Sequence, residues 1–354
     1  MRVWGAPAFG LEQVAKGELL LAEMNRLTAF HHAACAPYRR LVDVLFAGLR
    51  PATRLDQVPF LPVRLFKDRE LLSVPRAEVV KTMTSSGTSG QAPSKIFLDK
   101  ATAALQIKVL AAIMASFIGG RRLPMLVIDS ASTVSDRRKF SARAAGILGF
   151  SVFGRDVTYA LDDAMELDHE RMAAFLQRHA GEPVLLFGFT AIVWQHLVLA
   201  LERSGRALAL DQAILIHGGG WKKLQSLAVS NESFKARLQA VTGMSRIHNY
   251  YGMVEQTGSI FMECERGRLH ASAYSDVVIR DPLDFRVCAD GQPGLIQLMS
   301  TVPGSYPGHS LLSEDLGQTT GVDDCECGRR GRHFQVHGRM KNAEVRGCSD
   351  TYTG

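Results

Sequence analysis

Short apolar runs alternate with helical patterns through the middle of the chain, and this alternation limits the possible folds more than any other feature. Three runs have the length and composition of buried strands: Met125–Ile128, Val184–Phe187 and Ala213–Ile216. The stretches near 136–149, 161–180 and 190–204 have the spacing of helices. Strands that alternate with helices are typical of a parallel sheet with helices packed on its faces. The sequence therefore predicts an α/β protein with a largely parallel sheet.

The segments on either side of this region have different patterns. Residues 11–50 show helical spacing of apolar side chains, whereas after Ile247 short β-rich pieces are separated by Gly and Pro turns. These pieces are Ser259–Glu263, Val277–Arg280 and Gly294–Ser300, and they predict an antiparallel subdomain. The expected organisation is an N-terminal helical region at 1–78, an α/β region with a phosphate loop at 79–246, a β-rich subdomain at 247–337 and a hinge-like tail at 338–354.

A strand-like run, Val79–Met83, leads into a loop of hydroxyl and glycine residues. The loop consists of Thr84, Ser85, Ser86, Gly87, Thr88, Ser89 and Gly90. Hydroxyls and consecutive backbone N–H groups suit a polyphosphate, and glycine allows its close approach. The loop differs from the P-loop of nucleotide hydrolases because no lysine directly follows its glycines, and the next lysine is Lys95. A flexible Ser/Gly surface loop is the alternative interpretation of the composition alone.

Three later motifs follow this loop. They are Asn249–Glu255 (Asn-Tyr-Tyr-Gly-Met-Val-Glu), Ser313–Gly317 (Ser-Glu-Asp-Leu-Gly) and Gly338–Lys341 (Gly-Arg-Met-Lys). Together with the loop they resemble the ordered motifs of the adenylate-forming superfamily, which includes the acyl-CoA synthetases. Val254 stands where the superfamily usually has threonine, so the hydroxyl of that position has to come from elsewhere. The resemblance implies a large N-terminal domain with mixed and parallel sheets flanked by helices, and a C-terminal β-rich subdomain.

The same resemblance implies a site for ATP and Mg²⁺. A carboxylate oxygen has to attack the α-phosphate, so backbone donors, cations and a metal must neutralise the charge that gathers there. By resemblance Glu255 holds Mg²⁺, Asp315 accepts the ribose hydroxyls and Lys95 is catalytic. Arg339 would donate to the ribose or a phosphate. The other expected nucleotide-binding residues are the loop 84–90, the adenine-loop residues His217, Gly218, Gly219 and Gly220, and Asn249, Tyr250, Tyr251, Gly252 and Lys341. Ordinary surface acids are the alternative for Glu255 and Asp315.

Four residues with metal-ligand chemistry occur in two pairs. His270 follows Cys264 after five residues, and Cys325-x-Cys327 is followed by Gly328, which permits a tight turn. Three sulfurs and one imidazole are a ligand set that tetrahedral zinc favours, and four protein ligands leave no open position. We therefore expect a structural Zn²⁺ site; similar Cys-x-Cys-Gly-Arg segments occur in the phenylacetate-CoA ligase branch of the superfamily. Buried apolar cysteines and a satisfied histidine are the alternative.

The end of the sequence indicates a narrower family. Residues 338–350, Tyr251–Gly258 and Ser305–His309 resemble segments of the acyl-protein synthetase family, and the resemblance covers nearly the whole chain. The best-known member belongs to the fatty-acid reductase complex of bacterial bioluminescence, where it adenylates a fatty acid and takes the acyl group on a cysteine near its C-terminus. Cys348 matches that cysteine, and Arg346 can lower the pKa of its thiol. An incidental exposed thiol is the alternative. The superfamily's mobile C-terminal domain is expected to be missing.

These resemblances imply an AMP-forming acid–thiol ligase that acts on a carboxylic, specifically a fatty, acid and passes the acyl group to a reductase or a carrier protein. Two alternatives stay open: an acyl- or aryl-CoA ligase, and a non-catalytic zinc-containing module that binds nucleotides or nucleic acid. The formal charge of +6 does not favour nucleic acid, because the basic residues are not gathered into a block. Phe187–Thr190 and the residues near Trp194 belong either to an acyl pocket or to the core.

The composition predicts a cytoplasmic protein. The chain begins without a basic segment followed by an apolar stretch, so no secretory leader is expected. The most apolar run, Leu105–Ile118, contains Gln106 and Lys108 and predicts a buried helix rather than a membrane span. The six cysteines are therefore expected to be thiols or metal ligands rather than a disulfide framework.

Overall fold

The computed structural model describes residues 5–85, 93–135, 141–221 and 226–340, and the chain divides into two compact units. Among the described residues, the first unit comprises 5–85, 93–116 and 252–340, and the second comprises 117–135, 141–221 and 226–251. Seven residues with expected roles lie outside the described residues, and their roles stay predictions: Ser86, Gly87, Thr88, Ser89, Gly90, Lys341 and Cys348.

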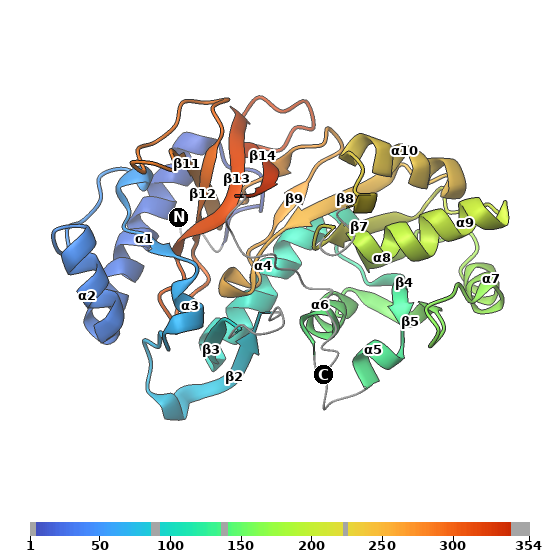
Figure 1. Ribbon diagram of the computed structural model, residues 1–354, viewed down its shortest axis with the longest axis horizontal. Helices are drawn as coiled ribbons and strands as arrows, with labels where there is room; N and C mark the ends of the chain where they lie inside the picture. Colours follow the sequence, from blue (N-terminus) through green and yellow to red (C-terminus); the bar gives the residue numbers. More distant parts are fainter. Residues whose placement is uncertain (1–4, 86–92, 136–140, 222–225, 341–354) are drawn as a thin grey trace. The chain divides into compact units, whose positions relative to one another are not determined.

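The second unit contains a parallel sheet in the order β8-β7-β6-β4-β5 (Figure 1). Its strands are β4 (Leu123–Ser130), β5 (Gly154–Leu161), β6 (Leu185–Phe189), β7 (Ile214–Gly218) and β8 (Arg246–Tyr251). Each neighbouring pair in this order is parallel, which confirms the prediction of a largely parallel sheet in this region. Parallel strands need a long crossover between them, and helices supply most of these crossovers here.

The helices of the second unit lie between these strands in the sequence. They are α5 (Ser132–Ser135), α6 (Ala142–Ser151), α7 (His169–Arg178), α8 (Thr190–Val193), a π-helical turn (Trp194–Val198), α9 (Leu199–Ser204) and α10 (Asn231–Thr242). The helix expected over 161–180 is wrong in its first part, because α7 begins only at His169. The Asp168 side chain caps this helix by accepting a hydrogen bond from the Arg171 backbone N–H at 2.9 Å.

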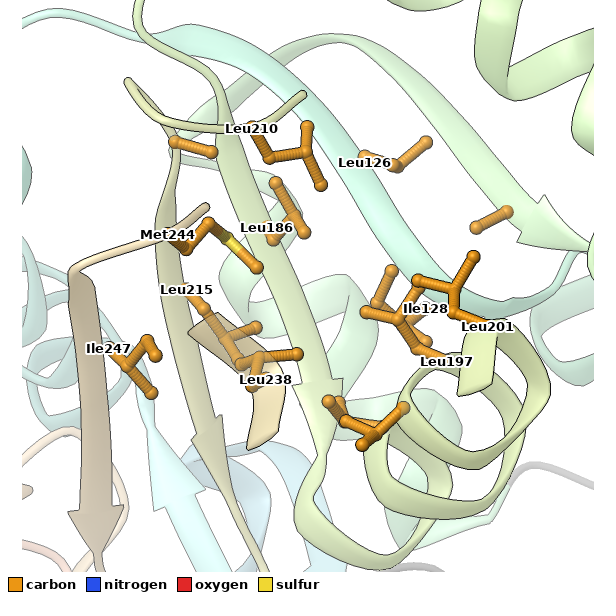
Figure 2. Close-up of a cluster of buried hydrophobic side chains, with 14 of the residues drawn as sticks. Leu126, Ile128, Leu186, Leu197, Leu201, Leu210, Leu215, Leu238, Met244 and Ile247 are labelled. Atoms are coloured by element: carbon orange, nitrogen blue, oxygen red, sulfur yellow. The ribbon is translucent and has the colours of Figure 1, made fainter. Parts of the chain in front are cut away.

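Helices cover both faces of the parallel sheet. Figure 2 shows one face, where Leu186 and Leu215 of the strands belong to the same buried cluster as Leu197 and Leu201 from the segment after β6. Successive side chains of a strand point to opposite faces, so Phe187 points to the other face. There it stacks on Phe150 of α6, with ring centroids 4.4 Å apart.

The aromatic residues that the sequence assigned either to an acyl pocket or to the core are core residues. Phe187, Phe189 and Trp194 are all buried. Trp194 stacks on Phe234 of α10, with ring centroids 5.8 Å apart, and the Arg237 guanidinium lies over its ring. These side chains therefore contribute to the packing of the second unit.

The first unit contains an antiparallel sheet in the order β11-β12-β13-β14-β10-β9. Its strands are β9 (Phe261–Glu263), β10 (Leu269–His270), β11 (Ser275–Arg280), β12 (Gly294–Ser300), β13 (Ser310–Val322) and β14 (Arg332–Arg339), and β1 (Leu61–Pro62) pairs with β13 in parallel. All neighbours from β11 to β9 are antiparallel, which confirms the predicted antiparallel subdomain.

The remaining elements of the first unit precede these six strands in the sequence. They are α1 (Gln13–Ala34), α2 (Ala36–Leu45), η2 (Leu55–Gln57), α3 (Leu65–Asp68), η3 (Arg76–Glu78), the hairpin of β2 (Val79–Thr84) and β3 (Lys95–Asp99), α4 (Lys100–Ile118) and the 3₁₀ turn η7 (Val254–Gln256). A buried ion pair connects α1 to β11, because Lys16 Nζ lies 3.7 Å from Asp276 Oδ1. The apolar residues Leu20, Met24 and Leu27 of α1 are also buried.

Helix α4 is long and apolar enough to cross a membrane by length and composition alone, with a mean hydropathy of 1.8. Buried core helices of soluble proteins meet the same criterion. Here Ile113 and Met114 are completely buried, and Gln106 and Lys108 interrupt the apolar run. The helix is nevertheless only partly buried, because 39% of its most apolar window is buried and Ile107 is exposed, so the predicted buried helix is confirmed only in part.

Candidate functional site

The phosphate-loop candidate connects the two strands of the β2–β3 hairpin. Thr84 is paired with Lys95 in the ladder. Beyond this pair, the Ser85 backbone N–H donates to Ser94 O at 3.0 Å, and the Ser94 N–H donates to Ser85 Oγ at 2.8 Å. Lys95 therefore lies at the base of the loop, across the hairpin from the first hydroxyl residue of the glycine-rich sequence.

Glu255 lies in the turn η7, which is next to β3 in the first unit. Its side chain is almost completely buried, with 2% of the residue exposed. The Tyr306 hydroxyl donates to the Glu255 backbone oxygen at 2.9 Å. The structure thus brings the turn that holds the expected metal ligand next to the strand that begins with Lys95.

Several buried polar atoms in and beside this turn have no hydrogen-bond partner within the part of the chain that the structure describes. Among them are Gln256 Oε1, Ser259 Oγ and Gln106 Nε2. Gly258 lies against α4, because a Cβ on it would be 2.7 Å from the Gln106 Cα. An unsatisfied buried polar group costs about 1–3 kcal/mol, so such a group commonly marks the place of a ligand or water. Polar atoms of this kind are suited to hydrogen-bond a nucleotide and its phosphates.

Asp315 and Arg339 face each other across the long hairpin of β13 and β14. They are partners in the antiparallel ladder, and Arg339 Nε lies 3.5 Å from Asp315 Oδ1. Glu314 Oε2 lies 3.7 Å from Nη2 of the same guanidinium. The side chains of Asp315 and Arg339 are 19% and 24% exposed, so both are accessible to a ligand. The structure therefore joins the two expected ribose-contacting residues in one ion pair.

The adenine-loop candidate follows β7 in the second unit. Gly219 and Gly220 have φ values of +88° and +65°, which L-residues other than glycine rarely adopt. A Cβ on Gly218 would lie 2.6 Å from the Tyr250 ring, and one on Gly219 would lie 2.8 Å from the Phe189 ring. The carboxyl ends of β6, β7 and β8 thus meet without room for side chains, at the edge where parallel sheets usually bind ligands.

The His217 side chain points into the second unit rather than toward solvent. Its Nδ1 atom lies 2.9 Å from Thr190 Oγ1, which in turn donates to Gly218 O at 3.1 Å. The ring lies 4.6 Å from the Phe234 ring, and burial lowers the pKa of His217 to about 3. The imidazole is therefore a neutral core group. Within the segment 217–220, the backbone of the glycines is the part that can contact a ligand. Asn249, the ladder partner of His217, and Tyr251 are half-buried on β8.

The four residues with metal-ligand chemistry come together in the first unit. One ligand atom of each lies within 4.8 Å of the others. Cys264 Sγ is 3.8 Å from Cys325 Sγ, and Cys327 Sγ is 3.4 Å from His270 Nε2. In a tetrahedral zinc site with Zn–S of about 2.3 Å and Zn–N of about 2.05 Å, these separations would be about 3.8 Å and about 3.6 Å. These two separations therefore match tetrahedral coordination, and the remaining ones are below 4.8 Å.

Two similar turns carry three of the four ligands, and His270 lies in β10, shortly after the first turn. Cys264 and Cys325 each begin a turn that ends in a glycine with positive φ, Gly267 at +72° and Gly328 at +80°. In each turn the glycine N–H donates to the cysteine oxygen at 3.0 Å. Ion pairs connect the turns, because Arg329 Nη1 lies 2.6 Å from Glu265 Oε2 and Arg266 Nη2 lies 3.1 Å from Glu326 Oε2.

Burial has a strong effect on the ionisation of these ligands. It raises the pKa of the Cys264 thiol to about 12, raises that of Cys325, and lowers that of His270 to about 3. Burial also opposes ionisation of Cys327, but hydrogen bonds from Arg329 and the neighbouring thiols lower its pKa overall. Without a cation the cluster would hold mostly neutral thiols, whereas a divalent metal would stabilise their thiolate forms.

The four residues Cys264, His270, Cys325 and Cys327, which we call the metal cluster, lie at the ends of two hairpins, one of which carries two nucleotide-site candidates. Cys264 follows β9, which begins five residues after Gln256 of the Glu255 turn. The Cys325–Cys327 turn joins β13 to β14, the strands of Asp315 and Arg339. His270 of β10 is the ladder partner of His333 in β14. A metal here would therefore fix both hairpins in register.

Sequence reasoning missed two polar residues near the Glu255 turn. Tyr306 lies in the Ser305–His309 segment, which was noted only as part of a family resemblance. Gln106 was noted only as a polar interruption of an apolar helix. A buried amide in such a helix is a signal that sequence alone offers, because it requires a partner.

Comparison with known proteins identifies the family. The family model described as Acyl-protein synthetase, LuxE, matches residues 8–353. A long-chain-fatty-acid–luciferin-component ligase from Vibrio harveyi is 22% identical over 351 residues, covering 93% of this chain and 88% of the relative. A protein of the same name from Aliivibrio fischeri is 23% identical over 273 residues, covering 74% of this chain and 69% of the relative.

Solved structures show the same fold. A crystal structure of 2-hydroxyisobutyryl-CoA ligase in an open conformation, with 2-HIB-AMP and CoA, has a TM-score of 0.71 at 18% identity. The match covers 94% of this chain and 77% of that chain. The postadenylation structure of that enzyme with 2-HIB-AMP gives a TM-score of 0.70 at 18% identity, over 94% of this chain and 69% of that chain.

The fold and the ordered motifs define an adenylate-forming enzyme, an AMP-forming acid–thiol ligase. Within this class the chain belongs to the acyl-protein synthetase family, whose model matches it over residues 8–353.

Proposed function

We propose that this chain activates a long-chain fatty acid with ATP and passes the acyl group through the thiol of Cys348 to a reductase or carrier protein. The observation that carries this proposal is the family match over residues 8–353. The two relatives are named as ligases of long-chain fatty acids. The structure supports the proposal because the Glu255 turn lies beside the β2–β3 hairpin and is surrounded by surplus buried polar atoms.

Two transfer steps follow from this proposal. In the first, a fatty-acid carboxylate oxygen attacks the α-phosphorus, and the bond to the β-phosphate oxygen breaks to release pyrophosphate. In the second, the Cys348 thiolate attacks the acyl carbonyl carbon, and AMP leaves with the electrons of the acyl–oxygen bond. The thioester keeps much of the reactivity of the adenylate while the nucleotide site is freed.

The expected site residues would supply charge and position for the first step. Glu255 would hold Mg²⁺, and bound Mg²⁺ neutralises charge on the phosphoryl oxygens. Lys95 at the base of the phosphate loop adds a positive charge, and the backbone N–H groups of the loop would donate to the phosphates. Asp315 would accept hydrogen bonds from the ribose hydroxyls, and Arg339 would donate to the ribose or a phosphate. The glycines after β7 would let the adenine approach the backbone.

The metal cluster has a structural role in this proposal. Cys264, His270, Cys325 and Cys327 would hold one Zn²⁺, since the donor set and spacing fit tetrahedral coordination. Four protein ligands leave no position for substrate, so the metal would act on folding rather than on chemistry. Its effect on catalysis would come through the two hairpins that it joins.

Acyl transfer can be tested by incubating the protein with ATP, Mg²⁺ and radiolabelled fatty acids of short, medium and long chain. We expect wild type to carry label that hydroxylamine releases, as a thioester does, and Cys348→Ser to form acyl-adenylate without becoming labelled. Cys288→Ser is the matched control, because this half-exposed cysteine lies outside the metal cluster. Equal labelling of Cys348→Ser and wild type would contradict the assignment. Faster formation of acyl-CoA than of acyl-protein would indicate a CoA ligase instead.

A further inference from the structure

The connection from β12 to β13 contains a buried segment to which the proposed function assigns no role. It comprises Pro303, Gly304, Ser305, Tyr306, Pro307, Gly308 and His309, and we call it the 303–309 segment. All of its residues except Gly304 are buried, and Tyr306 is completely so. Every contact described below lies within the first unit.

On one side this segment holds the turn that carries Glu255. The Tyr306 hydroxyl donates to the Glu255 oxygen at 2.9 Å. Gln256 Nε2 donates to Gly308 O at 2.8 Å and to Leu298 O at 3.1 Å. Two successive residues of the turn are therefore hydrogen-bonded to the 303–309 segment, one through its backbone and one through its side chain.

On the other side the segment is bonded to the phosphate-loop hairpin and to α1. Ser305 Oγ donates to Phe97 O of β3 at 2.7 Å, and Ser305 O accepts from the Ser73 N–H at 2.8 Å. His309 Nε2 lies 3.0 Å from Thr28 Oγ1 of α1. The 303–309 segment thus connects the Glu255 turn to the β2–β3 hairpin, in which Lys95 is the first residue of β3.

The packing between Tyr306 and the Glu255 turn leaves little room. A Cβ on Gly308 would lie 2.8 Å from Glu255 O and too close to the Tyr306 ring for either to stay in place. The Tyr306 ring also packs edge-on against Phe66 of α3, with centroids 6.0 Å apart. With the ring held on both sides, its hydroxyl has a fixed direction, and so has the carbonyl to which it donates.

We propose that Tyr306 is a positioning residue, and that its hydrogen bond to Glu255 O sets the place of the Glu255 carboxylate relative to the phosphate-loop hairpin. This inference rests on the proposed role of Glu255 in holding Mg²⁺ with the nucleotide. A metal ligand held in place before the metal arrives loses less freedom on binding, so metal binds more tightly. Without the hydroxyl, the turn keeps the side-chain hydrogen bonds of Gln256 but loses the hydrogen bond to the backbone oxygen of Glu255, the expected metal ligand.

The test compares Tyr306→Phe with a matched control, Tyr274→Phe. Tyr274 is also buried in the first unit, and its hydroxyl donates to a backbone oxygen, that of Ala6, at 3.1 Å. Each variant loses one buried hydroxyl bond, but only Tyr306→Phe loses one to Glu255. The rate of ATP–pyrophosphate exchange is measured against Mg²⁺ concentration, at a temperature well below the unfolding transition of every variant.

We expect Tyr306→Phe to raise the half-saturating Mg²⁺ concentration about three- to tenfold, which is the effect of one lost hydrogen bond on an equilibrium constant. Tyr274→Phe should leave this concentration at the wild-type value. If both variants lose thermal stability but keep the wild-type Mg²⁺ dependence, Tyr306 is only a packing residue and the proposal is overturned.

A second variant and a separate control complete the test. Gly308→Ala keeps the tyrosine hydroxyl but must displace Glu255 O, so it should also raise the half-saturating Mg²⁺ concentration. An unchanged Mg²⁺ dependence in this variant overturns the proposal if Tyr306→Phe does not fold. Glu255→Gln tests the underlying function, because wild-type exchange in that variant would refute the role of Glu255 itself. Loss of exchange in Glu255→Gln with a silent Tyr306→Phe would refute only the inference about Tyr306.

Discussion

Asp315 of β13 and Arg339 of β14 are ladder partners, and the carboxylate Oδ1 lies 3.5 Å from the guanidinium Nε. The pair holds both side chains in place before a nucleotide binds, yet each remains partly exposed. Glu314 lies next to Asp315 in the sequence and 3.7 Å from Nη2 of the same guanidinium. Asp315 is expected to touch the nucleotide, whereas Glu314 is not. Substituting each acid in turn therefore distinguishes a direct contact with the nucleotide from a change of charge beside Arg339.

Asp315→Asn should weaken ATP binding because a charged acceptor for the ribose hydroxyls is lost. Hydrogen bonds to charged groups are worth roughly 1.5–3 kcal/mol, so the KM for ATP should rise about ten- to a hundredfold. Glu314→Gln removes the same charge from beside Arg339 and should change this KM less than about threefold. Pyrophosphate exchange at varied ATP measures both values. Equal effects of the two substitutions would mean that Asp315 acts through Arg339 and not on the ribose.

The purified protein should contain about one zinc per chain, which elemental analysis measures directly. Cys325→Ser should lose this zinc and unfold at a lower temperature, because the metal joins two hairpins of the first unit. Cys288→Ser should keep the metal, since Cys288 lies outside the cluster. Because one of these hairpins carries Asp315 and Arg339 and the other follows the Glu255 turn, zinc loss should also raise the KM for ATP below the unfolding temperature. A stable, active protein free of zinc would refute the structural role.

Gly219→Ala should destabilise the second unit more than Gly220→Ala does. Both glycines have positive φ, so each substitution carries a similar backbone cost of about 1 kcal/mol. Only at Gly219 would the new Cβ meet a ring, that of Phe189 at 2.8 Å. Thermal unfolding should therefore show the larger loss for Gly219→Ala. Equal losses of stability would mean that the Phe189 ring moves aside without a cost in free energy.

The stability of the fold should fall as the pH drops below about 6.5. Burial lowers the pKa of His31 to about 3, whereas an unfolded histidine titrates near 6.5. Between these values the unfolded chain binds the proton and the folded chain does not, so folding loses up to about 1.4 kcal/mol per pH unit for this group. Burial also lowers the pKa values of His217 and His309, which adds to the effect.

The contribution of His31 can be isolated by replacing it with glutamine, which can bond to the same neighbours, Ser73 and Pro303. Denaturant unfolding of His31→Gln at pH 7.5 and 5.5 should show a weaker pH dependence than wild type. His337→Gln is the control, because His337 is exposed. An unchanged pH dependence in His31→Gln would show that this histidine is protonated in the folded protein.

The sequence predicts the elements whose apolar pattern is strong. The buried strands β4, β6 and β7 and the helix α4 all lie where short or long apolar runs indicate them. By contrast, β5 and most of β13 carry polar and half-exposed residues, so neither shows a strand pattern by itself. These two strands form because neighbouring strands offer backbone partners, which are contacts between residues distant in the sequence.

The sequence motifs predict which residues belong to the candidate site, but not how these residues contact one another. The motifs name Glu255, Asp315 and Arg339, and the cysteine spacing suggests the metal cluster. They could not show that Asp315 and Arg339 form an ion pair, because that depends on the register of β13 and β14. Likewise, the bond from Tyr306 to the Glu255 oxygen depends on a connection that folds back over 51 residues.

ATP–pyrophosphate exchange across a panel of fatty acids tests the central claim, the adenylation of an acid at the Glu255 site, most directly. We predict exchange that depends on the acid and is strongest with long chains. Glu255→Gln, which keeps the shape of the side chain but removes its charge, should reduce the rate about a hundredfold or more, while Glu314→Gln stays near wild type. Exchange by Glu255→Gln at the wild-type rate, or no exchange by wild type with any acid while ATP still binds, would contradict the account.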